Sequence, residues 1–338
     1  MERNDAVTPP TETTRLQADV IAAIEPAAGR HLEVLVPVEK AWQPSDYLPD
    51  LESAGWQEGL AALRQAAQGV SDELLVVLVG DMVTEEALPS YSMALNALVR
   101  DDEGTGPGPW ARWLRGWTAE ENRHGDLLNA YLRLTGRVDM RAVEQTVHHL
   151  IANGFDPKTH PDPYNILIYT SFQERATRIS HGNVGRIARQ QGDDSLARIC
   201  GIIAGDEARH ETFYTRMMSE VLDQDPAGGI LAFRAMIRGI IAMPGRLMAD
   251  GREPDLFDRF AVVAQRIGVY TVRDYASIIQ HLVAAWDIAG RRVSGAAADA
   301  QDEVCRQAQR YERLADRRAA AIEKQPATAF SWIHDRQA

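Results

Sequence analysis

Two short segments of the sequence place acidic residues and a histidine at a spacing that can bind a metal ion. The first runs from Glu120 to His124 and the second from Asp206 to His210, and each contains Glu-x-x-His preceded by a further acid. On an α-helix, three residues advance by about 300° and about 4.5 Å, so the glutamate and the histidine project from one face. Each pair can therefore reach the same metal centre.

Two other segments place a glutamate in core-like surroundings, Glu85 within residues 80–89 and Glu174 within residues 169–177. In chain order the helices then supply Glu, Glu-x-x-His, Glu and Glu-x-x-His, which is the ligand set of dinuclear carboxylate sites in ferritin-like bundles. Four carboxylates balance the charge of two divalent irons, whereas without metal their burial would cost many kcal/mol or require protons. Oxygen and imidazole donors without thiolate favour iron or manganese over structural zinc. The predicted ligands are Glu85, Glu121, His124, Glu174, Glu207 and His210.

The elements that must position these residues read almost entirely as helices, because strand signals are nearly absent. We expect helices over residues 12–25, 71–99, 111–134, 138–153, 164–191, 195–223, 228–243, 256–265, 272–288 and 296–323. Residues 36–44 cannot be helical throughout, because Pro37 and Pro44 bias the preceding residues away from the α region. We predict an all-α fold with a four-helix bundle core and additional helices. It forms one domain over residues 15–338, preceded by a flexible arm over residues 1–14.

Composition excludes several other classes of protein. The net charge of -12 argues against general binding to nucleic acid and to anionic membranes. Two cysteines, Cys200 and Cys305, cannot form a disulfide scaffold, a four-cysteine zinc site or a cysteine-ligated iron–sulfur cluster. The N-terminus has no apolar signal segment, and the apolar runs are too short to cross a membrane. We therefore expect a cytoplasmic protein that does not insert into membranes.

Some conspicuous residues have a structural interpretation. Trp110, Trp113 and Trp117 form one helical stripe, which is typical of core packing. We expect His181, beside a glycine, at a helix end, and Cys200 as a small core residue.

Longer motifs extend from about Leu32 to the C-terminus. They include VEKAWQP at 38–44, VLVGDM at 77–82, WTAEENRHGD at 117–126, YTSFQERAT at 169–177 and ISHGN at 179–183. In these motifs the sequence resembles the soluble acyl-[acyl-carrier-protein] desaturases, most closely the plant-type stearoyl-ACP Δ9-desaturases. The resemblance implies two irons per chain, bridged by Glu121 and Glu207, with Glu85 and Glu174 as terminal ligands.

The resemblance also assigns three residues near the metal to catalysis. Asp206 would support a ligand histidine and link it to Trp42, and Thr177 would lie near the oxygen-binding face. The implied reaction uses O₂ and two electrons from ferredoxin to form a cis double bond, at Δ9 of a saturated C16–C18 chain on acyl carrier protein. The resemblance also implies a homodimer.

Residues that would contact the acyl chain and the acyl carrier protein can be nominated from their places in the sequence. An apolar tunnel beside the metal would select the reacting carbons, and we expect its wall to include Met93, Ala94, Ala97 and Leu98. Acyl carrier protein is acidic, as is this chain, so binding requires a local basic patch. The candidates for that patch are Lys40, Arg234, Arg238 and Arg246.

Two other functional classes fit the same ligand pattern. A di-iron oxygenase, either a hydroxylase or an N-oxygenase, would form an oxygenated product at the same metal site. A non-enzymatic iron-handling bundle would need only the metal ligands, although storage bundles usually have shorter chains.

Overall fold

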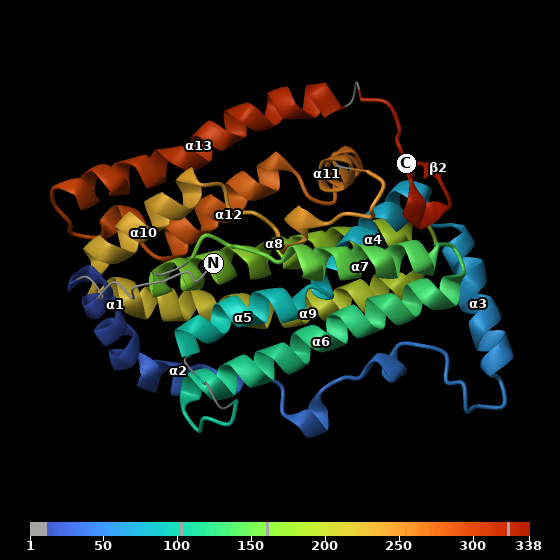
Figure 1. Cartoon of the computed structure of the whole chain (residues 1–338), viewed down its shortest axis with the longest axis horizontal. Helices are drawn as coiled ribbons and strands as arrows, with labels where there is room; N and C mark the ends of the chain where they lie inside the picture. The colour runs from blue at the N-terminus through green and yellow to red at the C-terminus, as the bar shows by residue number, and fades with distance from the viewer. Residues whose placement is uncertain (1–11, 100, 102–103, 160–161, 254, 323–324) are drawn as a thin grey trace, which may run out of the picture.

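The structure, a computed structural model, describes residues 12–99, 101, 104–159, 162–253, 255–322 and 325–338. Long helices running side by side make up nearly all of it, as Figure 1 shows, which confirms the predicted all-α class. The helices are α1 (Glu12–Ala23), α2 (Glu25–His31), α3 (Trp56–Gln68), α4 (Asp72–Glu85), α5 (Leu88–Val99), α6 (Pro109–Thr135), α7 (Met140–Asn153), α8 (Pro163–Gln190), α9 (Asp194–Gln224), α10 (Pro226–Arg238), α11 (Leu256–Arg266), α12 (Val272–Ala285) and α13 (Ala296–Ile322).

Short elements complete the described chain. Six 3₁₀ turns lie within it: η1 (Leu32–Val34), η2 (Val38–Lys40), η3 (Pro44–Asp46), η4 (Pro244–Leu247), η5 (Ile288–Gly290) and η6 (Ser331–Ile333). Near the C-terminus, β1 (Ala329–Phe330) pairs antiparallel with β2 (Arg336–Gln337).

Helices α4, α6, α8 and α9 form the central bundle, in which α8 packs along α9 and α4 contacts both α6 and α8. Helix α13 packs on α10 and α12, and these outer helices cover the α8 side of the bundle (Figure 1). The opposite side of the bundle carries the segment between α2 and α3, which runs along α6 (Figure 1). The bundle is thus covered on two sides by elements that contribute no predicted ligand.

Capping residues fix where the ligand-bearing helices begin and end. The side chain of Asp162 accepts from the Tyr164 amide at the start of α8, and Pro163 occupies the first turn, where no amide donor is needed. Asp193 caps α9 in the same way. Helix α6 ends at Gly136, whose φ of 65° is left-handed and favours glycine. These signals explain why the predicted boundaries of the three helices lie close to the observed ones.

The prediction of one helix over residues 71–99 is wrong, because the helix is interrupted between α4 and α5. Pro89 has no amide hydrogen, and its ring would clash with the carbonyl of Glu85 in a continuous helix. The Glu85 carbonyl instead accepts from the Tyr91 hydroxyl at 3.3 Å, while Glu86 and Ala87 form a turn. The interruption leaves Glu85 as the last residue of α4.

Three other boundaries differ from the prediction. The helix expected over residues 12–25 ends two residues earlier, since α1 stops at Ala23 and α2 begins at Glu25 with Pro26 in its first turn. Helix α3 was not predicted. The helix expected to reach residue 243 ends at Arg238, shortly before Ile240 adopts a φ of 58°. Residues 1–11 of the predicted arm lie outside the described chain, and α1 already begins at Glu12. The division into an arm and one domain stays a prediction.

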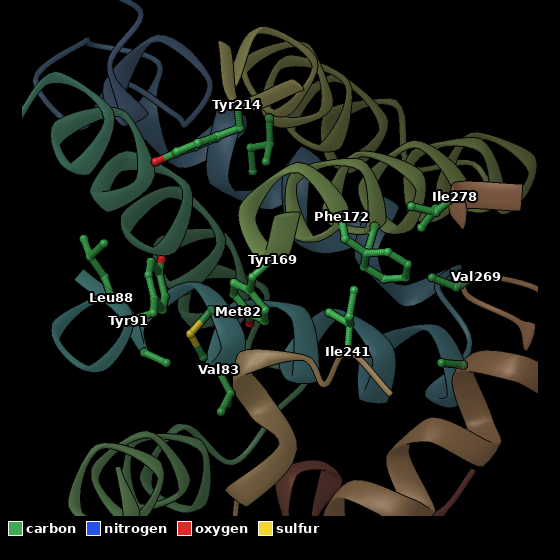
Figure 2. Close-up of a cluster of buried hydrophobic side chains, with 14 of the residues drawn as sticks. Met82, Val83, Leu88, Tyr91, Tyr169, Phe172, Tyr214, Ile241, Val269 and Ile278 are labelled. Carbon is green, nitrogen blue, oxygen red and sulfur yellow. The ribbon is translucent and has the colours of Figure 1, made fainter. Parts of the chain in front are cut away.

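One continuous core joins the bundle to the outer helices. Figure 2 shows Met82 of α4, Phe172 of α8 and Ile278 of α12 among its buried side chains. The C-terminal segment also anchors to the bundle, because Trp332 donates its indole N–H to Thr146 and Arg336 makes two hydrogen bonds to Asp72 at 2.8 and 2.9 Å. The start of α4 is therefore fixed by the far end of the chain.

Within the described part of the chain, no helix is both long enough and apolar enough to span a bilayer.

Gly80 sets how closely α11 approaches α4. A Cβ built on Gly80 would lie 2.1 Å from the ring of Phe260, whereas one on the exposed Gly201 of α9 meets nothing within 4 Å. We expect Gly80→Ala to lower the free energy of unfolding by about 1–3 kcal/mol through overpacking. Gly201→Ala, the matched control, should leave it unchanged or raise it by up to about 1 kcal/mol. Urea unfolding of both variants checks this, and equal effects would contradict it.

Candidate metal centre

Helices α4, α6, α8 and α9 bring the six predicted ligands together in the middle of the bundle. All six side chains are buried. Their ligand atoms form two groups, and within each group the atoms lie within 4.8 Å of one another. We name the group Glu85, Glu121, His124 and Glu207 the first half-site, and the group Glu121, Glu174, Glu207 and His210 the second half-site. Glu121 and Glu207 belong to both, as bridging ligands must.

Both histidines turn Nδ1 towards the carboxylates. The Nδ1 atom of His124 lies 3.3 Å from Glu207 Oε1 and 3.6 Å from Glu121 Oε2. The Nδ1 atom of His210 lies 2.7 Å from Glu121 Oε1 and 3.4 Å from Glu174 Oε2. The inward-facing donors of the cluster are therefore oxygens and imidazole nitrogens.

The outward nitrogens face a second pair of acids. His124 Nε2 lies 3.4 Å from Asp206 Oδ2, and His210 Nε2 lies 2.9 Å from Glu120 Oε2. Each Glu-x-x-His segment thus supplies the acid that holds the histidine of the other segment. Metal-bound histidines commonly have such a carboxylate partner, which fixes the tautomer and the ring orientation.

Asp206 and Thr177, two of the residues expected to act in catalysis, each contact a residue of the half-sites. The Trp42 indole N–H donates to Asp206 at 2.9 Å, so Trp42, Asp206 and His124 form a connected series. The Thr177 hydroxyl donates to Glu207 Oε2 at 2.7 Å.

Three residues with roles at the site were not predicted. His181 Nε2 lies 2.8 Å from Glu85 Oε1, and the Trp117 indole donates to Glu174 Oε1 at 3.0 Å. The prediction of His181 at a helix end is wrong, since α8 continues to Gln190. Its position seven residues after Glu174, on the same helical face, was the signal that could have found it. Glu120 was noted only as an acid in the motif.

Four buried atoms at the centre make no hydrogen bond of acceptable geometry, although His210 Nδ1 and Glu121 Oε1 lie close together: they are Nδ1 of His124 and His210, and Oε1 of Glu121 and Glu207. A buried polar atom left unsatisfied costs about 1–3 kcal/mol. All four belong to the half-sites and are donors that divalent transition metals accept. The cluster therefore fits metal ions.

The pKa shifts within the cluster also indicate a site suited to metal ions. Burial, reinforced by the charge of Glu121, raises the pKa values of Glu174 and Glu207. Burial opposes a charge on His124 and His210, but the surrounding carboxylates outweigh it and raise both pKa values well above the usual range. Burial also acts to raise the pKa of Glu85, yet contacts with His124 and His181 lower it to about 2. The cluster without metal thus retains protons, which metal ions must displace on binding.

A mostly apolar cavity reaches this centre. Its wall includes Leu95, Phe155, Ile166 and Pro244, together with four of the ligands and Thr177. Tyr91 and Tyr169, which Figure 2 labels among the buried side chains, line it as well. An apolar chain in this cavity would lie directly against four of the predicted metal ligands.

The residues proposed for the tunnel wall do not account for this cavity. Met93 does not line it and is 77% exposed, so that prediction is wrong. The side chain faces a separate hollow between α6 and the segment that precedes α3. The side chains of Ala94, Ala97 and Leu98 lie outside the described part of the structure.

The four candidates for the basic patch lie on three elements, and two of them form ion pairs with acids. Arg238 pairs with Glu303, and Arg246 pairs with Asp258 while lying over the ring of Phe257. Lys40 is exposed on η2 and Arg234 is half-buried on α10. Partner binding by these residues stays a prediction.

Comparison with known proteins adds independent findings. A family model described as fatty acid desaturase matches residues 16–334. The chain is 54% identical over 308 residues to the chloroplastic stearoyl-[acyl-carrier-protein] 9-desaturase of Ricinus communis, covering 90% of this chain and 77% of the relative. It is 51% identical over 323 residues to the chloroplastic acyl-[acyl-carrier-protein] desaturase of Cucumis sativus, covering 94% and 82%.

Among solved structures, the X-ray structure of the putative acyl-ACP desaturase DesA2 from Mycobacterium tuberculosis H37Rv superposes with a TM-score of 0.52. The alignment covers 81% of this chain and 96% of that chain at 21% identity. At this identity the likeness shows the fold alone, and it agrees with a ferritin-like bundle.

The shared carboxylates give a test of the two half-sites. Glu207→Ala removes a donor from both, whereas Glu85→Ala removes one from the first half-site only. After anaerobic loading with Fe²⁺ and desalting, we expect Glu207→Ala to retain almost no iron and Glu85→Ala to retain about one ion per chain, because ligand count governs retention. Iron is measured by plasma mass spectrometry, with folding checked by circular dichroism. Equal retention by the two variants would contradict the shared role of Glu207.

Proposed function

The chain belongs to the fatty acid desaturase family, and we propose that it introduces a cis double bond at Δ9 of a saturated C16–C18 acyl chain carried on acyl carrier protein. The observation that carries this proposal is the apolar cavity whose wall contains metal ligands. A cavity of this kind can place an unactivated methylene group beside an oxidising centre. The curated relatives, which carry desaturase names, support the acyl carrier protein as the carrier.

The proposed cofactor is a pair of iron ions, one in each half-site, with Glu121 and Glu207 shared between them. With O₂, the two ions would supply the oxidising chemistry needed to break unactivated C–H bonds, which no side chain can provide. The donor set supports iron, since carboxylate and imidazole ligands without thiolate suit iron and manganese.

The reaction balances when electrons and protons are supplied. The acyl chain loses one hydrogen from each of two adjacent carbons, and the double bond forms between them. O₂ takes up these two hydrogens, two electrons and two protons, and yields two molecules of water. We propose ferredoxin as the donor of the electrons, one at a time.

The chain's own residues supply position and shielding. The apolar wall around Leu95, Phe155 and Ile166 orients the acyl chain and excludes water, which reduces side reactions. Thr177 lines the cavity and donates its hydroxyl proton to Glu207, so it holds a proton at the boundary between cavity and centre. The connected series Trp42, Asp206 and His124 leads from a half-buried indole to the first half-site, and we propose it for electron entry.

The remaining parts of the proposal concern partners and location. We retain Lys40, which is exposed, and Arg234, which is half-buried, as contacts for the acidic carrier protein. Besides the hydrogen bond from Arg238, the charge of Arg234 helps to lower the pKa of the neighbouring Glu303 carboxyl. Homodimer formation and a cytoplasmic location stay predictions.

Product identity tests the function directly. The iron-loaded protein is incubated with ferredoxin, its reductase, O₂ and either stearoyl-ACP or palmitoyl-ACP, and the fatty acids are derivatised for mass spectrometry. We expect one cis double bond at Δ9. An alcohol would point instead to the hydroxylase alternative, and two bound irons without any product would contradict the desaturase.

Ile166 gives a prediction about chain length. This buried residue of α8 lines the cavity, so Ile166→Ala enlarges the space available to the acyl chain. A methylene group in such a pocket is worth about 1–3 kcal/mol. We therefore expect the ratio of kcat/KM for stearoyl-ACP to that for palmitoyl-ACP to rise by roughly tenfold or more.

The matched control is Ile151→Ala, on the outer part of α7 and away from the cavity. This variant should keep the wild-type ratio. The prediction fails if the two variants shift the ratio equally or if neither shifts it.

A further inference from the structure

The two Glu-x-x-His segments each place an arginine directly before the histidine, but these arginines make different contacts. Arg209 donates through Nη2 to Glu120 at 2.8 Å and to Asp206 at 2.6 Å, and through Nη1 to the Val34 carbonyl at 2.6 Å. Arg123 approaches Asp206 only to 3.7 Å, and its Nε and Nη2 atoms have no hydrogen-bond partner. Its guanidinium lies 5.0 Å from the centroid of the Trp42 ring.

We propose that Arg209 is a positioning residue for both half-sites, because one guanidinium fixes the two carboxylates that hold the two histidines. Asp206 faces Nε2 of His124 in the first half-site, and Glu120 faces Nε2 of His210 in the second. Arg209 is hydrogen-bonded to both acids. The orientations of the two histidines are therefore coupled through a single side chain that touches neither metal nor substrate.

Charge explains why a cation is needed at this point. Asp206 and Glu120 are buried beside a cluster that already contains four carboxylates. A guanidinium stays charged at any working pH, and its donors have fixed directions, so it can bridge two acids and hold both in place. Charge-assisted hydrogen bonds of this kind are roughly twice as strong as neutral ones. Without Arg209 each acid would lose its charged donor and keep a neutral one, which holds it less firmly. The neutral donor is the Trp42 indole for Asp206 and the Val36 amide for Glu120.

The same network also fastens a surface segment, residues 34–42, which we name the strap. Besides the bond from Arg209 to the Val34 carbonyl, the Val36 amide donates to Glu120 at 2.9 Å and the Trp42 indole donates to Asp206 at 2.9 Å. The strap therefore contacts the layer around the histidines at three points. Between these points it is open to solvent, with Val38 82% exposed and Lys40 exposed. Loss of Arg209 should loosen the strap as well as the histidines.

Metal binding to the metal-free protein tests the proposal. Mn²⁺ is titrated into the wild type and into Arg209→Gln, Arg209→Lys, Glu120→Gln and Arg123→Gln, and free Mn²⁺ is read by electron paramagnetic resonance. We expect two ions per wild-type chain and, for Arg209→Gln, about 10–100-fold weaker binding of both ions, the usual loss for a residue that supports a metal ligand. Arg209→Lys, which keeps the charge but not the fork of donors, should be intermediate.

The other two variants separate coupling from general damage. Glu120→Gln should lower the affinity for one ion and leave the affinity for the other unchanged, because Glu120 supports only His210. Arg123→Gln, at the equivalent place in the other segment, should bind both ions as the wild type does.

A second readout does not involve metal. Trypsin cleavage after Lys40, followed by mass spectrometry of the metal-free protein, reports how firmly the strap is held. We expect faster cleavage at this bond in Arg209→Gln than in the wild type and in Arg123→Gln.

Three results would overturn the proposal. Arg209→Gln could bind both ions with wild-type affinity, it could bind only one of them more weakly, or Arg123→Gln could lose as much affinity as Arg209→Gln. Fewer than two ions per wild-type chain would also overturn the proposal. If Arg209→Gln does not fold, Arg209→Lys decides, with weaker binding of both ions in support and wild-type binding against. The inference rests on the two-metal centre of the proposed function, but the assays use no acyl carrier protein. A protein that bound two ions and formed no double bond would therefore refute the function and not this role of Arg209.

Discussion

Four carboxylates in the middle of a helical bundle repel one another, and much of the structure compensates for that repulsion. The energy between like charges a few ångströms apart is large where water is excluded, and burial adds a desolvation cost to each charge. Two histidines face the carboxylates, and they carry raised pKa values for that reason. Divalent ions remove the repulsion more completely than protons do, because each brings two charges to a point that several oxygens share.

The surrounding layer keeps this arrangement in one geometry. His181, Trp117 and Thr177 each hydrogen-bond one glutamate of the cluster, which limits the positions that its carboxylate can take. The acids beyond the histidines would add two more negative charges, and Arg209 counters them. The same bundle must also admit an apolar chain. It does so by lining the cavity with apolar and aromatic side chains and presenting the carboxylates only where the cavity meets the centre.

Much of the site follows from helical spacing, and the rest depends on how helices meet. Glu121 and His124 share one helical face whatever the tertiary structure, so the sequence sufficed to nominate them. Glu120 was missed because its partners His210 and Arg209 lie on another helix, and the relative rotation of two helices is set by packing that the sequence does not state. The helix predicted to begin at residue 71 was expected to continue past Glu85, where the structure interrupts it. Pro89 was a visible warning of that interruption.

The proposed chemistry depends on two divalent ions bound at the carboxylate cluster. Anaerobic calorimetric titration of the metal-free protein with Fe²⁺, repeated in two buffers of different ionisation enthalpy, measures the number of ions bound and the protons released. We expect two ions per chain with a net release of protons, because the raised pKa values of the histidines and Glu174 favour bound protons, which metal must displace. Binding of a single ion, or of two ions without proton release, would contradict it.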